Sequence, residues 1–154
     1  MHPHAGMRAA CIERDGSRLP TFDLVKQLHR ELQAQASVLV GSTIQRVRFA
    51  GNHPPPKTNP WKPYEGITTL EAGNKGAVVS QLKKDNHRFL VIVNQDYLDS
   101  MPLSLGWKQD RRVGTVRKDG VVQMLEANSL QTQVGPGDAL ILTWEAPATP
   151  VSTP

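Results

Sequence analysis

Apolar positions recur at two different spacings along the chain, and the change of spacing separates one helix from the strands that follow it. Between residues 20 and 36 they recur every three or four positions, at Phe22, Val25, Leu28, Leu32 and Ala36. This spacing places them on one stripe of an amphipathic helix, with the polar residues facing away. Since a helix of about 16 residues is marginal alone in water, we expect the stripe to need a partner surface.

Beyond residue 36 the apolar stretches shorten to the lengths that are typical of strands. Residues 88–95 contain the richest run, Phe89-Leu90-Val91-Ile92-Val93, which predicts a strand buried on both faces. Residues 139–144 form a second near-continuous apolar strand, and we expect these two strands to be central in a sheet. The Asp119-Gly120 pair predicts a tight hairpin. The pattern therefore predicts a mainly β protein, an antiparallel β-sandwich of about eight strands preceded by one amphipathic N-terminal helix.

Changes in composition predict five segments along the chain. The segment between the helix and the later strands contains five prolines, which exclude a helix and a central strand, so we expect a stiff, extended linker there. The last residues have nothing to bury. The predicted segments are a flexible N-terminus (1–19), a unit of helix and strand (20–50), a Pro-rich linker (51–66), the β-sandwich domain (67–145) and a disordered tail (146–154).

The charge balance narrows the expected partners. The chain has a formal net charge of +4, but its cations form short pairs that are separated by apolar strands and by aspartates. Nucleic-acid binding is therefore not expected. The single cysteine, Cys11, excludes an internal disulfide. No apolar run reaches the length of a membrane span, and the N-terminus lacks the apolar core of a signal peptide, so we expect no membrane association and a cytoplasmic location by default.

Candidate chemistry is sparse in this sequence. Almost all carboxylates after the linker fall in predicted turns, where Asp closes hairpins, whereas a glycosidase needs two carboxylates that face each other across a cleft. His2 and His4 lack a third ligand nearby, and the serines lack a nucleophile motif. We therefore expect no catalytic residues, no metal site, no cofactor and no enzymatic activity.

Aromatic residues provide the one candidate binding site. Trp61, Tyr64 and Tyr97 could stack against a sugar ring, and Asn94 could bind hydroxyl groups. A binding platform requires exposed rings, whereas Trp61 and Tyr64 alternate with prolines and could instead pin the linker to the domain surface. Two further tryptophans are interpreted as core residues because they lie on alternating strands: Trp107 and Trp144.

Two parts of the chain resemble the end of a known type of enzyme. Residues 13–32, with the acidic Glu13-Arg14-Asp15-Gly16 turn, Pro20 and the helix, look like the end of a glycoside-hydrolase (β/α)8 barrel. Residues 88–96, the Lys118-Asp119-Gly120 turn and residues 136–142 resemble the small C-terminal β-sandwich of β-galactosidase-like retaining glycosidases.

The resemblance implies a role without catalysis. In that family the catalytic glutamates lie on barrel strands, and no position of this sequence matches their motifs. We therefore expect a truncated relative that lacks the barrel and acts as an accessory module, packing against or stabilising a catalytic barrel. The apolar face of the helix could also join copies of this chain into a homo-oligomer. The alternative is a carbohydrate-binding module that uses the exposed aromatics.

Overall fold

The computed structural model describes residues 11–13, 15–52 and 54–146. Most of the predicted flexible N-terminus (1–19) and all of the predicted tail (146–154) except Ala146 lie outside these residues. The described part contains one helix and nine strands, which in chain order are α1 (Pro20–Leu39), β1 (Thr43–Gly51), β2 (Ile67–Glu71), β3 (Gly76–Lys84), β4 (His87–Asn94), β5 (Met101–Trp107), β6 (Val113–Val116), β7 (Val122–Met124), β8 (Ser129–Val134) and β9 (Ala139–Glu145).

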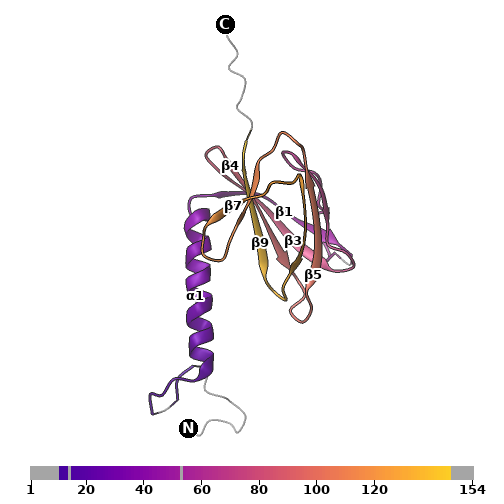
Figure 1. Ribbon diagram of the computed structural model, residues 1–154. Helices are drawn as coiled ribbons and strands as arrows, with labels where there is room; N and C mark the ends of the chain where they lie inside the picture. Colours follow the sequence, from indigo (N-terminus) through magenta and orange to yellow (C-terminus); the bar gives the residue numbers. More distant parts are fainter. Residues whose placement is uncertain (1–10, 14, 53, 147–154) are drawn as a thin grey trace.

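The strands form two antiparallel sheets that pack into a β-sandwich (Figure 1). The larger sheet has six strands in the order β1-β3-β4-β9-β6-β7, and the smaller has the order β2-β5-β8. The prediction of a mainly β antiparallel sandwich preceded by a helix is confirmed. β4 and β9 are the two central strands of the six-stranded sheet, as their continuous apolar sequences predicted.

The main core lies between the two sheets. Leu90 and Ile92 of β4 and Leu142 of β9 are completely buried there, and Leu103 and Leu105 of β5 face them from the smaller sheet. Each such side chain contributes about 1.5–3 kcal/mol by leaving water. Trp107 and Trp144 are also buried in this cluster, so their interpretation as core residues is confirmed.

β1 belongs to the sandwich, although the sequence pattern assigned residues 20–50 to a separate unit. It pairs with β3 from Thr43↔Lys83 to Gly51↔Gly76, and Phe49 is buried. The Pro-rich stretch then leads from β1 in one sheet to β2 in the other. The segment predicted as a linker between units therefore connects the two sheets of one sandwich. The prediction was wrong because prolines prevent regular secondary structure but do not mark a domain boundary.

α1 touches the sandwich only through its C-terminal half. Val38 and Leu39 pack with Phe89, Val116 and Ile141 on the side of the six-stranded sheet that faces away from the core. The rest of the helix projects beyond the sandwich (Figure 1), and none of its residues is buried. A 20-residue helix is about 30 Å long. No helix in the described part of the chain is both long and apolar enough to cross a membrane.

Candidate functional site

The structure places two of the four sequence-predicted binding residues against the core. Trp61 and Tyr64 are half-buried and pack against the main hydrophobic cluster. The ring of Tyr64 meets that of Trp144 edge to face, with centroids 6.2 Å apart. These contacts attach the Pro-rich stretch to the sandwich and bury part of both side chains.

Asn94 and Tyr97 lie elsewhere. Glu65, which follows Tyr64, forms an ion pair with Arg88 near the start of β4. Asn94 lies at the other end of this strand, about 20 Å from Arg88. Tyr97 is 80% exposed, but Asn94 is only 1% exposed. The four residues therefore do not form one platform, and carbohydrate binding through them stays a prediction.

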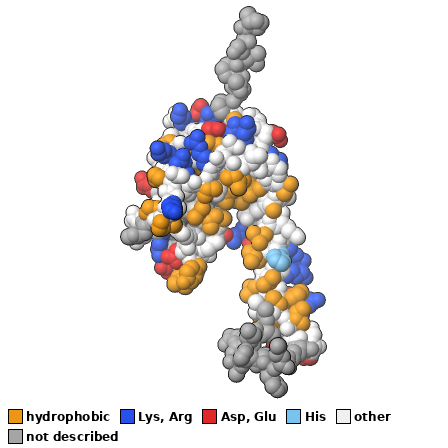
Figure 2. Space-filling view, turned by 180° about the vertical axis from the view of Figure 1, so that it is seen from behind, with side chains coloured by type: hydrophobic (Ala, Val, Ile, Leu, Met, Phe, Trp, Pro, Cys, Tyr) orange, Lys and Arg blue, Asp and Glu red, His pale blue; other side chains and the backbone are white. Residues whose placement is uncertain are grey.

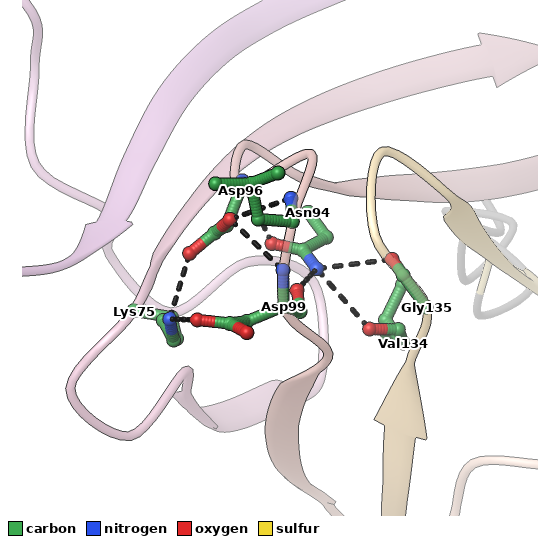
Figure 3. A network of polar contacts seen from close by, with 7 residues as sticks. Lys75, Asn94, Asp96, Asp99, Val134 and Gly135 are labelled. Carbon is green, nitrogen blue, oxygen red and sulfur yellow. Dashed lines mark hydrogen bonds and ion pairs between the residues drawn. The ribbon is translucent and has the colours of Figure 1, made fainter.

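The side chain of Asn94 joins the loop after β4 to the end of β8 (Figure 3). Its Nδ2 donates to the carbonyl oxygens of Asp99 (2.8 Å), Gly135 (2.9 Å) and Val134 (3.2 Å). Its Oδ1 accepts a hydrogen bond from the backbone N–H of Asp96. The amide is thus fully used inside the protein, so its role in this structure is to hold the ends of β4 and β8 together.

A small charged cluster surrounds this amide (Figure 3). Lys75 Nζ lies 2.7 Å from Asp96 Oδ2 and 2.9 Å from Asp99 Oδ2. Asp96 Oδ1 also accepts the backbone N–H groups of Leu98 and Asp99. The hydrogen bond from Lys75, followed by those two, lowers the pKa of Asp96 from 3.8 to about 2. The hydrogen bonds to the carboxylates of Asp96 and Asp99 raise the pKa of Lys75. The cluster closes the loop after β4, and its carboxylates are occupied by protein donors.

Among residues 11–13, 15–52 and 54–146, no group of three or more His, Cys, Asp or Glu side chains is arranged to hold a metal ion. The largest unexplained feature of the described chain is apolar. It consists of the outer side of the six-stranded sheet and of the helix beside it.

The outer face is the side of the six-stranded sheet that faces away from the core, and two rows of paired residues cross it. The strand registers define the first row as Val47, Ser80, Val91, Ile141, Val116 and Val122. They define the second row as Ile44, Leu82, Phe89, Thr143, Gly114 and Met124. Only Ser80 and Thr143 are polar, and neither row contains a charged residue. A sheet with one face in water normally alternates apolar and polar positions, so these two rows form a second apolar surface of the sheet, bordered by the polar row of Lys84, His87 and Glu145.

In the described part of the chain, the outer face is covered in its middle and exposed at its edges. Val38 and Leu39 lie over its middle, on Phe89, Val116 and Ile141. At its two edges the side chains of Ile44, Val47, Val122 and Met124 are between 42% and 66% exposed. Figure 2 shows hydrophobic side chains gathered on the sandwich and again along the projecting helix.

The leucine stripe of α1 consists of Leu24, Leu28 and Leu32. These residues are four positions apart and therefore share one side of the helix. Their exposed fractions are 67%, 52% and 53%. We call the leucine stripe and the outer face together the docking surface.

Polar contacts fix the angle between α1 and the sandwich. Lys118, in the turn between β6 and β7, lies 3.5 Å from Glu31 of the helix and 3.0 Å from Asp138 before β9. The hydrogen bond to Asp138 is the main cause of the raised pKa of Lys118. Gly120, in the same turn, approaches the helix so closely that an added Cβ would lie 2.7 Å from the carbonyl oxygen of Ala34.

Hollows border the helix where it leaves the sheet. One, of about 870 Å³, lies between Val38 and the outer-face residues Phe89, Val122 and Met124. Another, of about 890 Å³, is lined by Arg30, Glu31, Ala34 and Gln35 of α1, by the turn between β6 and β7, and by β8. The contact between helix and sheet is thus narrow, and charged as well as apolar side chains line the space beside it.

The fold and the site together define a helix-bearing antiparallel β-sandwich with an uncovered apolar surface. Comparisons of this chain with protein-family models, with curated proteins and with solved structures gave no match.

Proposed function

We propose that this protein is a non-catalytic accessory module of a glycoside-hydrolase-like protein. Its role would be to stabilise or assemble catalytic (β/α)8 barrels through the docking surface. The observation that carries the proposal is α1, a 20-residue helix with no buried residue and an exposed leucine stripe. Large contiguous apolar patches are rare on monomeric proteins and mark interaction sites.

The energetics of the helix support this role. Helices in proteins gain most of their stability from packing an apolar face. Covering Leu24, Leu28 and Leu32 would each contribute up to about 1.5–3 kcal/mol, depending on how much of each side chain is covered. In the isolated chain these three side chains stay exposed to water, so a bound partner that covers them would stabilise both α1 and the assembly.

The choice of partner rests on the resemblance to barrel-associated sandwiches. Residues 13–32 look like a barrel-closing helix, and the strand sequences are similar to those of C-terminal sandwich domains of glycosidases. The carboxylates at the sandwich ends also favour a role without catalysis. Asp96 and Asp99 pair with Lys75, and Glu65 pairs with Arg88.

A mixing experiment tests this function. The (β/α)8 barrel encoded beside this chain in its genome would be purified and heated with and without the protein. We expect co-elution in gel filtration and a slower loss of glycosidase activity on heating, and both effects should disappear with Leu28→Glu. If the barrel neither co-elutes nor gains stability at micromolar protein, or if no such barrel is encoded there, the proposal is wrong.

A further inference from the structure

The docking surface has two halves that one copy of the chain cannot bring together. α1 is held at its C-terminal end by Val38, Leu39 and the Lys118–Glu31 ion pair. Its N-terminal half therefore projects away from its own sheet (Figure 1), while the β1 edge of the outer face remains uncovered. An exposed apolar helix and an exposed apolar sheet face on the same chain are complementary surfaces.

The leucine stripe lies on the side of the helix that borders β3 and β4. Leu39 follows Leu32 by seven positions, so both lie on the same side of α1. Leu39 packs in one cluster with Leu82 of β3 and Val91 of β4. Ala34, by contrast, approaches the turn between β6 and β7, so the opposite flank is already occupied.

We propose that the occupant of the docking surface is a second copy of this chain, in a two-fold dimer whose α1 helices run antiparallel. The two-fold axis passes beside Leu28, so that Leu28 meets Leu28 of the second copy and Leu24 meets Leu32. This register places residues 20–25 of each helix beside residues 31–36 of the other, where the outer face begins. The first turns of each helix thus reach the β1, β3 and β4 part of the other copy's outer face.

Symmetry and charge favour a second copy over an unlike partner. A two-fold interface must be complementary to itself, and the leucine stripe satisfies this condition when it is centred on Leu28. The stripe and both rows of the outer face contain no charged residue. Two copies with a formal charge of +4 each can therefore meet there without bringing like charges into contact.

The inference rests on the proposed function and names the partner of its docking surface. In such an assembly the docking surface joins the two copies and the barrels bind the dimer, so Leu28→Glu removes the dimer and barrel binding together. A dimer that leaves the barrel unstabilised would disprove the function alone. A monomer that still binds the barrel through Leu28 would disprove only the second copy as the occupant.

Sedimentation equilibrium of the full chain tests the dimer. We expect a mass of twice 17.0 kDa at micromolar concentration. Leu28→Glu on the helix and Val47→Glu on the outer face should each raise the dissociation constant at least 100-fold. The matched controls Gln33→Glu, on the polar side of α1, and Gln131→Glu, on exposed β8, should change it less than threefold. All four positions are exposed, and circular dichroism would verify that each variant is folded.

Cross-linking tests the register. In a Cys11→Ser background, Leu28→Cys should form a disulfide-linked dimer on mild oxidation, because the axis brings the two positions together. Gln33→Cys, on the opposite side of the helix, should not. A monomer up to 1 mM, a dimer that both Glu variants leave intact, or equal cross-linking at the two positions would overturn the proposal.

Discussion

At the scale of single residues, Asn94 shows what a sequence pattern can and cannot reveal. Its position after an apolar strand predicted the end of β4. Its three acceptors, however, belong to Asp99, Val134 and Gly135, two of which lie about 40 positions away in the chain. A local pattern contains no information on such partners. A polar residue that could have bound a hydroxyl group is instead a buried clamp.

Replacing this clamp should destabilise the fold. Asn94→Ala removes a donor from three carbonyl oxygens, of which only that of Gly135 keeps a backbone donor among the bonds described, the N–H of Asp138, and we expect the free energy of unfolding to fall by about 2–4 kcal/mol. Urea denaturation measures this loss. Gln95→Ala, at the exposed neighbouring position, is the control and should stay within about 0.5 kcal/mol of the wild type. Equal effects of the two substitutions would contradict the role of Asn94.

The neighbouring carboxylate predicts a dependence on pH. The pKa of Asp96 in the folded protein, about 2, lies below the ordinary value of 3.8. Its ionised form therefore stabilises the fold fully above pH 4, and this contribution is lost as the pH falls towards 2. Denaturation between pH 5 and pH 2 should show a smaller loss of stability for Asp96→Asn than for the wild type. Identical pH profiles would show that the Lys75 contact is unimportant.

At the scale of elements, the positions of the strands in the sequence were easier to predict than the pairing between strands. The apolar runs of β4 and β9 predicted two central strands, and they are central. The pairing of β1 with β3 was missed because these strands are separated by the Pro-rich stretch and by β2. The outer face was missed for another reason. A continuous apolar run indicates that both faces avoid water, but it does not say which molecule covers each of them.

The contact between α1 and the turn of β6 and β7 can be tested with a matched pair of glycines. Gly120 (φ +81°) and Gly137 (φ +62°) both have backbone angles that disfavour other residues. An added Cβ would approach the Ala34 carbonyl at Gly120, but it would meet nothing within 4 Å at Gly137. Each alanine substitution should cost about 1 kcal/mol for the backbone alone. Only Gly120→Ala should also speed hydrogen exchange in residues 31–39, and equal exchange in both variants would contradict this contact.

At the scale of the whole molecule, the sandwich has a filled core, but part of its outer apolar surface is exposed to solvent. The six-stranded sheet has a core on one side and, on the other, an apolar face whose β1 and β7 edges are exposed. Only Val38 and Leu39 of the adjacent helix pack on that face. The sequence predicted that the helix needs a partner. It could not show that the same chain also carries a second, matching apolar face, because that face is assembled from all six strands.

The central claim is that α1 and the outer face form one surface that is covered when the protein is assembled. Hydrogen–deuterium exchange of the full chain at increasing protein concentration tests it most directly. Exchange in residues 20–32 and 43–51 should slow together as concentration rises in the wild type, and Leu28→Glu should abolish this change in both segments. Exchange that is independent of concentration, or protection of only one of the two segments, would contradict the account.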